Sequence, residues 1–248
     1  MRHEVGLRIF TSNRLETLAE KLSEVIKAPL SSPLDKEVII VQSRGMERWV
    51  SMRLAHHLGI SANISFAFPK AFVRRVMSAL MPEFSENQAV EPDTITWKIL
   101  GLLPSFVKSP GFEAIDVYLG GGMFEEGKGS EFNLKLFQLA ERIADVFDQY
   151  MIFRPEMVLS WEAGKTGGKD EGWQAEIWRA SMKGDASYHP AKLRENFLKK
   201  MQYQNIAINN LPERISVFGI SSLPRFHLDI IHALAGSMDV NFFLMSPS

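Results

Sequence analysis

Residues 38–59 read VIIVQSRGMERWVSMRLAHHLG, and this stretch decides the fold class. Its first four residues, Val38–Val41, form a continuous β-branched run, which is typical of a parallel strand covered on both faces. We expect a helix from about Met46 to Leu58, because Gly59 follows at the position where helices commonly end in a left-handed residue. A buried strand that leads directly into a helix predicts an α/β fold.

The same alternation of strand and helix occurs near both ends of the chain. Leu7–Thr11 is an apolar run typical of a buried strand, and apolar residues at helical spacing follow over 15–26. Near the other end, the strands expected at Ile215–Phe218 and Val240–Met245 flank a helix at Pro224–Ala235. Together with Val38–Val41 these runs predict one parallel sheet of four strands.

The central part of the chain shows a different pattern. Residues 66–205 contain helical patterns and loops, without a convincing strand. The simplest architecture is therefore an α/β domain of residues 1–65 and 206–248, interrupted by an all-helical insertion subdomain of residues 66–205. A four-stranded sheet with no closing element also suggests a fragment of a longer protein.

Composition excludes several classes of function. The 248 residues include 28 basic and 29 acidic side chains, which excludes a uniformly basic nucleic-acid coat but leaves room for a local basic patch. The absence of cysteine excludes disulfides, Cys-ligated zinc, iron–sulfur clusters and thiol catalysis. We find no signal peptide and no apolar stretch near the ~20 residues of a membrane helix. We therefore expect a cytoplasmic protein without membrane contact.

The residues of an ATP site are missing where this fold would place them. The turn after the first strand reads Thr11-Ser12-Asn13-Arg14-Leu15, which lacks the glycines and the lysine of a phosphate-binding loop. Gly164-Lys165-Thr166 lacks the upstream glycine and follows a helix. Asp145 and Asp148 share a helix face and could hold magnesium, but no third ligand lies nearby in the sequence. We therefore expect no catalytic, cofactor-binding or metal-binding residues in this chain.

Basic clusters occur on two predicted helices. Arg44 and Arg48 lie four residues apart with Arg53 beyond them, and Lys70, Arg74 and Arg75 form the second cluster. Such clusters are most often solvated helix faces, and contact with phosphate is the less common interpretation. Their position near the carboxyl edge of the expected sheet, where α/β proteins usually bind ligands, favours the phosphate interpretation somewhat.

Several longer strings resemble a known family in the same order along the chain. The clearest are VQSRGMERW at 41–49 and ADVFDQYMIFRP at 144–155, supported by shorter matches at 8–15, 59–64 and 218–224. Together they resemble the N-terminal region of the gamma subunit (RecC) family of exodeoxyribonuclease V. The match extends over nearly the whole chain, and members of that family are several times longer.

The resemblance implies a fold and a function. It implies a degenerate P-loop helicase-like fold, in which the sheet is a first motor domain that has lost its ATP site and the insertion is an accessory subdomain. It also implies a non-catalytic subunit that joins a beta helicase–nuclease subunit and an alpha helicase subunit, with ATP and magnesium bound by those partners. In double-strand-break repair and recombination, such a complex splits duplex ends while the gamma subunit guides single-stranded DNA and scans it for a Chi-like sequence.

The family motifs imply nine DNA-binding residues. These are Gln42, Arg44, Arg48, Phe68, Lys70, Arg74, Asp145, Asp148 and Arg154. Gln42 could present an amide to a base edge, the aspartates could accept from an exocyclic amine, and the arginines could bind phosphate or guanine.

Three of these positions depart from the family pattern. Arg44 and Arg48 stand where Chi-reading members carry small or amide side chains, and Arg74 replaces an aromatic one. These departures leave open whether the chain reads a different DNA sequence or holds the strand only electrostatically. Two alternatives also stay open: Asp145 and Arg154 form a structural ion pair, or the region is a scaffold that packs against the partner motors without reading DNA.

Overall fold

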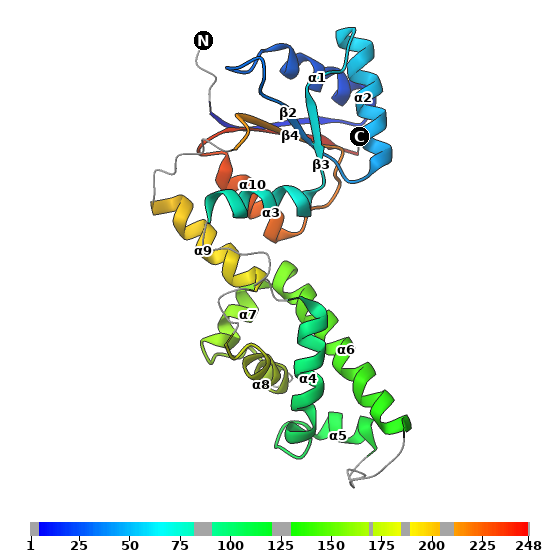
Figure 1. Ribbon diagram of the computed structural model, residues 1–248, viewed down its shortest axis with the longest axis vertical. Coiled ribbons are helices and arrows are strands. Elements are labelled where there is room, and N and C mark those ends of the chain that lie inside the picture. Colours follow the sequence, from blue (N-terminus) through cyan, green and yellow to red (C-terminus); the bar gives the residue numbers. More distant parts are fainter. Residues whose placement is uncertain are drawn as a thin grey trace. The chain divides into compact units, whose positions relative to one another are not determined.

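A five-stranded parallel sheet lies at the centre of the α/β part of the chain (Figure 1). The computed structural model describes residues 5–81, 91–120, 130–168, 171–184, 189–203 and 211–247. In spatial order the strands are β1 (Gly6–Ser12), β5 (Asp239–Met245), β4 (Arg214–Phe218), β2 (Glu37–Ile40) and β3 (Ile64–Ala67). All neighbouring strands are parallel, so the α/β fold class is confirmed.

The expected number of strands was wrong, because β3 is a fifth strand. It is only four residues long and reads ISFA, so it offers no continuous apolar run to recognise. It pairs with β2 at the edge of the sheet, where only one side of a strand needs a hydrogen-bonding partner.

Ten helices occur in the described residues. They are α1 (Leu15–Lys27), α2 (Arg44–Leu58), α3 (Pro69–Leu80), α4 (Pro92–Phe106), α5 (Glu113–Leu119), α6 (Ser130–Phe153), α7 (Pro155–Glu162), α8 (Gly172–Ser181), α9 (Pro190–Tyr203) and α10 (Arg225–Leu234). Helices α1 and α2 cover one face of the sheet, and α3 and α10 cover the other (Figure 1).

The chain divides into two compact units. The sheet unit comprises residues 1–84 and 197–248, and the helical unit comprises residues 85–196. These limits differ from those expected, because residues 66–84 lie in the sheet unit rather than in the insertion. The reason is that α3 packs against α10 and buries Phe72, Val73 and Val76 in that unit. The second expected boundary, between residues 205 and 206, lies outside the described residues.

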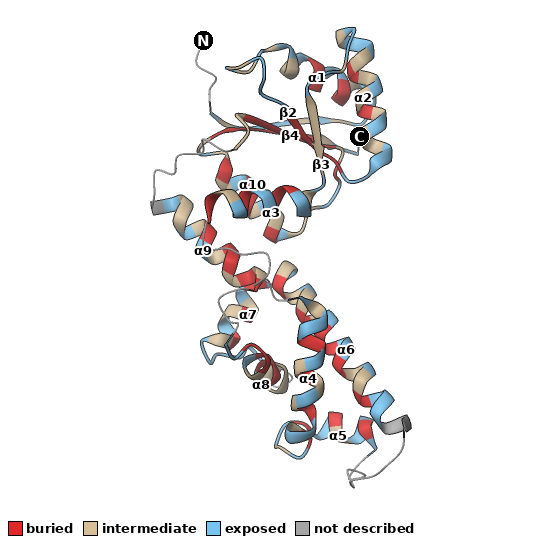
Figure 2. Cartoon of the chain, viewed as in Figure 1, coloured by how far each residue is buried: buried red, intermediate tan, exposed pale blue. Residues whose placement is uncertain are grey.

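Aromatic side chains organise the core between the sheet and α1. Phe10 stacks on Phe243 with ring centroids 4.9 Å apart, and Phe218 lies beside Phe243. Leu18 and Leu22 of α1 pack into the same cluster and are fully buried. Figure 2 marks part of α1 as buried. Because this cluster ties β1, β4 and β5 to α1, it fixes the turns that leave the carboxyl edge of the sheet.

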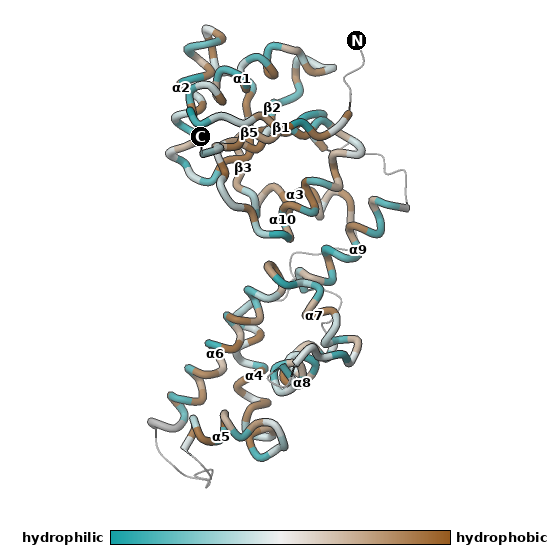
Figure 3. Tube along the Cα trace, turned by 180° about the vertical axis from the view of Figure 1, so that it is seen from behind, coloured by the Kyte–Doolittle hydropathy of each residue, from teal (hydrophilic) through white to brown (hydrophobic). Residues whose placement is uncertain are grey.

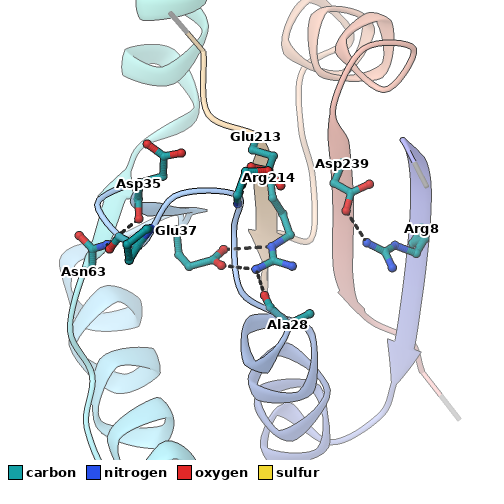
Figure 4. A network of polar contacts seen from close by, with 10 residues as sticks. Arg8, Ala28, Asp35, Glu37, Asn63, Glu213, Arg214 and Asp239 are labelled. Atoms are coloured by element: carbon teal, nitrogen blue, oxygen red, sulfur yellow. Dashed lines mark hydrogen bonds and ion pairs between the residues drawn. The ribbon is translucent and has the colours of Figure 1, made fainter. Parts of the chain in front are cut away.

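A buried ion pair stabilises the opposite, amino edge of the sheet (Figure 4). The guanidinium of Arg214, in β4, is only 2% exposed and binds both carboxylate oxygens of Glu37 in β2. Its Nη2 also donates to the backbone oxygen of Ala28, at the end of α1, over 2.8 Å. Nearby, Arg8 donates to Asp239 over 2.8 Å. The first ion pair joins β4, β2 and the end of α1, and the second joins β1 to β5, all through charged hydrogen bonds.

The helical unit has its own core around the aromatic rings of α6, α7 and α8. The ring of Phe147 meets those of Trp161 and Trp178 edge to face, at centroid distances of 6.1 and 5.3 Å. Hydrophobic and hydrophilic stretches alternate along α6, as Figure 3 shows, so one side of this helix faces the core. The 24-residue α6 therefore presents its other side, which carries Asp145, to solvent.

A half-buried carboxylate links α7, α8 and the residue before α9. Glu162, the last residue of α7, accepts from His189 Nε2 over 2.6 Å and from Trp178 Nε1 over 3.4 Å. The backbone N–H of Lys192 donates to Nδ1 of His189, which leaves Nε2 as the donor toward Glu162. His189 is completely buried, so no water can replace this partner.

We expect Glu162→Ala to lower the free energy of unfolding of the helical unit by about 1–3 kcal/mol for each donor left unpaired. Glu162→Gln keeps an acceptor oxygen, so it should lower the free energy of unfolding clearly less. Urea unfolding followed by tryptophan fluorescence measures this, because Trp97, Trp161, Trp173 and Trp178 all lie in the helical unit. Equal losses in the two variants would contradict the assigned role of the carboxylate.

Candidate nucleic-acid interface

The turn between β2 and α2 presents three of the expected residues to solvent. Gln42, Arg44 and Arg48 are all exposed. The turn is well defined, because the hydroxyl of Ser43 accepts from the backbone N–H of Met46 over 3.2 Å and so caps α2. The cap sets where the helix begins, and Arg44 and Arg48 consequently lie one helical turn apart on its outer side.

The turn between β3 and α3, with the first turns of α3, presents three more of the expected DNA-binding residues to solvent. Phe68 precedes α3 and is 39% exposed, and Pro69 occupies the first helical turn, where its missing N–H costs nothing. Lys70 and Arg74 are exposed, because the opposite side of α3 carries the buried apolar residues that face the sheet, among them Phe72.

The pairing of β2 with β3 brings the two turns to the same edge of the sheet. Ile40 lies opposite Ala67, and the backbone N–H of Val41 donates to the oxygen of Ala67 over 3.0 Å. The strands are parallel, so the residues that follow them leave the sheet side by side. We call this exposed surface the β2–β3 edge, and it consists of Gln42, Arg44, Phe68 and Lys70.

Arg48 and Arg74 lie one turn further along helices that cover opposite faces of the sheet (Figure 1). The expected group of six is therefore a group of four at the edge with one arginine on either side. An amide, an aromatic ring and two cations at one exposed edge can hydrogen-bond a base, stack on a base and bind phosphate.

A glycine holds the start of α2 against the sheet. Gly219, in the loop after β4, has a φ of +64°, in the left-handed region that favours glycine. A Cβ at this position would lie 3.3 Å from the methyl carbon of Met46, in the first turn of α2. This close approach fixes the first turn of the helix, which carries Arg44, over the carboxyl edge.

His227 is a neighbour of this edge that the sequence did not reveal. It lies near the start of α10, is half-buried, and its Nδ1 is buried without a hydrogen-bond partner. Burial lowers the pKa of His227, and the positive charge of Lys70 lowers it further. The two residues are 157 positions apart and are brought together by the packing of α10 against α3, so no local pattern could have paired them.

This pKa shift predicts a pH-dependent stability. An unfolded histidine titrates near 6.5, and the folded state binds this proton less readily, so protonation favours unfolding. We expect the contribution of neutral His227 to the free energy of unfolding to be complete above pH 6.5. This contribution should be lost as the pH falls below that value. His227→Gln should make the stability depend less on pH. The urea midpoint of unfolding, measured at several pH values between about pH 7.5 and pH 5.5, tests this. A midpoint that falls as steeply in the variant would contradict the prediction.

The remaining three expected residues belong to the helical unit. Asp145 is exposed and Asp148 is half-buried, three residues apart on one side of α6. Arg154 is exposed and precedes α7, with its guanidinium carbon 5.7 Å from the centre of the Tyr150 ring. In the described part of the chain no ion pair joins Asp145 to Arg154, so the structure offers no support for the structural pair left open above.

The turn after β1 has the geometry of an ordinary connection. The backbone N–H of Arg14 donates to the hydroxyl of Ser12, and α1 begins at Leu15 without a side-chain cap. No group of three or more His, Asp or Glu residues within the described ranges is placed to hold a metal ion. Among the described helices, none combines the length and the apolar character needed to cross a membrane.

Comparison with known proteins identifies the family. Residues 7–248 match the family model "RecC, N-terminal domain". The chain is 32% identical to the RecBCD enzyme subunit RecC of Escherichia coli (strain K12), over 97% of this chain and 22% of that protein. It is 31% identical to the Haemophilus influenzae subunit, over 96% and 23%, and 27% identical to that of Mycolicibacterium smegmatis, over 98% and 21%.

The chain thus spans about a fifth of the length of the curated relatives it matches. The family match, over residues 7–248, extends over both the sheet unit and the helical unit. This chain belongs to the RecC N-terminal domain family.

Proposed function

We propose that the chain is the N-terminal part of a non-catalytic gamma subunit of a helicase–nuclease complex of the exodeoxyribonuclease V type. The observation that carries this proposal is the match over nearly the whole chain to proteins named as subunits of the RecBCD enzyme. Its partners would be DNA, a beta helicase–nuclease subunit and an alpha helicase subunit. The complex would act in the cytoplasm, in double-strand-break repair and recombination.

The fold is in keeping with a helicase-like motor domain that has lost its ATP site. A parallel sheet that begins strand–turn–helix is the usual frame of a phosphate-binding loop, and the turn at Ser12–Arg14 has neither glycine nor lysine. ATP and magnesium would accordingly be bound by the partner subunits, and the contribution of this chain would be to guide DNA.

The β2–β3 edge is the surface best suited to that task. Arg44 and Lys70 would bind the phosphates, Phe68 would stack on a base, and Gln42 would present its amide to a base edge. Arg48 and Arg74 would extend the positive charge on either side. Asp145, Asp148 and Arg154 would contact the strand from the helical unit and complete the scan for a Chi-like sequence.

A scaffold role is the second candidate, and exposed apolar residues of the helical unit favour it. Trp97, Val117 and Tyr118 are 64%, 74% and 54% exposed. Large exposed apolar side chains are typical of surfaces that contact another protein. In this case the chain would pack against the motor subunits, and the basic edge would be a solvated surface.

Purification of the native full-length protein from its own host, with mass spectrometry of the co-eluting proteins, tests the proposed assembly. We expect two large helicase subunits in stoichiometric amounts, and ATP-dependent degradation of linear duplex DNA in the same fractions. A protein that elutes alone, without that activity, would refute the gamma-subunit assignment.

A further inference from the structure

Arg14, in the turn after β1, is an exposed cation at the carboxyl edge of the sheet that lies outside the β2–β3 edge. Its backbone N–H donates to the hydroxyl of Ser12 over 3.1 Å, and this hydrogen bond helps to hold the turn. In the part of the chain that the structure describes, its guanidinium forms no ion pair. The charge of Arg14 is therefore available to bind an anion from solution.

Gly219 brings the turns after β1 and after β2 to the same loop. A Cβ at Gly219 would lie 3.3 Å from the methyl carbon of Met46 and 3.6 Å from Cδ1 of Leu15. Leu15 directly follows Arg14, and Met46 comes two residues after Arg44. The first turns of α1 and α2 therefore pack on one glycine, so both arginines lie close to the loop that follows β4.

The connecting segments at the carboxyl edge contain no carboxylate. These segments, all of them described, are residues 12–14, 41–43, 219–224 and 246–247, with Phe68 between β3 and α3. Carboxylates occur only in the first turns of α1 and α2: Glu16 lies 3.9 Å from the guanidinium of Arg53, and Glu47 is half-buried. An anion that approaches this edge consequently meets mainly cations and polar groups.

The amino edge of the sheet has a different character (Figure 4). Four carboxylates lie there, those of Asp35, Glu37, Glu213 and Asp239. The arginines beside them are bound within the fold, Arg214 to Glu37 and Arg8 to Asp239. At the amino edge, carboxylates and arginines compensate one another, whereas at the carboxyl edge exposed arginines predominate. This asymmetry favours a polyanion at the carboxyl edge.

The loop after β4 supplies polar groups between the β2–β3 edge and Arg14. Ser221 and Ser222 are both exposed in this loop. Strand β4 pairs with β2, and neighbouring strands lie about 4.8 Å apart, so the loop leaves the sheet beside the turn that carries Gln42. Serine hydroxyls are common donors to the phosphate oxygens of DNA. Groups that can bind phosphate thus continue from the β2–β3 edge across β4 to Arg14.

We propose that Arg14 binds a phosphate of single-stranded DNA, and that the strand continues from the β2–β3 edge across the loop after β4 to the turn after β1. Ser221 and Ser222 donate to the backbone between Arg44 and Arg14. The proposal rests on the proposed function and adds a contact beyond the nine residues named above. The turn in which a phosphate-binding loop would hold a nucleotide holds the DNA backbone instead.

Binding of a labelled single-stranded oligonucleotide to the full-length protein, measured by fluorescence anisotropy over a series of salt concentrations, tests the proposal. Arg14→Gln should weaken binding at least about tenfold, which is the effect of one charge-assisted hydrogen bond. The slope of log K against log salt should become shallower by about 0.7, because one phosphate fewer is neutralised. Arg14→Lys keeps the charge and should keep the slope.

Lys27→Gln is the matched control, because Lys27 is exposed at the other end of α1, near the amino edge, and the change in charge is the same. It should leave the affinity and the slope unchanged. An equal loss in Lys27→Gln would overturn the proposal, because only net charge would then matter. So would a loss of affinity in Arg14→Gln without a change of slope, since that indicates a structural role.

Arg44→Gln in the same assay separates this proposal from the proposed function. Weaker binding with Arg44→Gln but not with Arg14→Gln would overturn the path across β4 and leave the β2–β3 edge as the DNA-binding surface. Unchanged binding in both variants would contradict DNA binding at the carboxyl edge altogether. A free nucleotide offers the same phosphate chemistry, so millimolar ATP is added as a competitor. Displacement of the oligonucleotide that depends on Arg14 would assign the turn to a nucleotide and overturn the proposal.

Discussion

Arg214→Met is expected to lower the free energy of unfolding of the sheet unit by about 3–5 kcal/mol, as removal of one partner of a buried ion pair does in other proteins. The loss of the guanidinium leaves the Glu37 carboxylate, which is 11% exposed, without its counter-ion. It also leaves the backbone oxygen of Ala28 without its donor. Urea unfolding followed by amide hydrogen exchange in β4 measures the effect in this unit alone.

A double variant separates the cost of the orphaned charge from a loss of packing. Glu37→Leu combined with Arg214→Met removes both charges, and apolar replacement of a buried pair is often neutral or stabilising. The double variant should therefore be more stable than Arg214→Met by at least about 1–2 kcal/mol. Arg225→Met, which removes a 60%-exposed arginine paired with Asp229, should cost less than about 1 kcal/mol. A double variant that is less stable than Arg214→Met, by the full loss that Glu37→Leu causes alone, would contradict this account.

The sequence predicted the elements whose local signals are strong. The continuous run at Val38–Val41 marked β2, and Gly59 marked the end of α2, where its φ is indeed +82°. Local spacing alone does not decide where α1 begins: Asn13 and Glu16 are spaced as in a capping box, but the helix begins at Leu15, after Arg14, without a side-chain cap. Local residues indicate where a helix can begin, and packing on the sheet decides among the possible positions.

What the sequence could not predict depends on the pairing of distant segments. Strand β3 exists because β2 offers it a hydrogen-bonding edge, and its four residues carry little pattern of their own. The same pairing brings Gln42 and Phe68 to one edge. The motifs named both residues, but the pairing that makes them neighbours follows only from the order of the strands. The position of His227 beside Lys70 is likewise a result of the packing of α3 on α10.

Reversal of charge at Arg44 and Arg48 is expected to weaken single-stranded DNA binding by the full-length protein about hundredfold. A charge-assisted hydrogen bond contributes about 1.5 kcal/mol or more, and that is about tenfold in Kd for each of two contacts. The slope of log K against log salt should also become shallower by about 1.4, because two fewer phosphates are neutralised and each contributes about 0.7 on a single strand. Fluorescence anisotropy of a labelled oligonucleotide with Arg44→Glu/Arg48→Glu over a series of salt concentrations gives both values.

The structure offers a control with the same change in net charge at the opposite edge of the sheet. Lys27, in the last turn of α1, and Lys36, just before β2, are both exposed near the amino ends of the strands. Lys27→Glu/Lys36→Glu should leave the affinity for single-stranded DNA and its dependence on salt nearly unchanged if the DNA runs along the carboxyl edge of the sheet. Equal weakening in the two double variants would mean that only net charge matters. No weakening in either, with the partner subunits still bound, would favour the scaffold, because that role requires the fold and its apolar surfaces but not the cations at the β2–β3 edge.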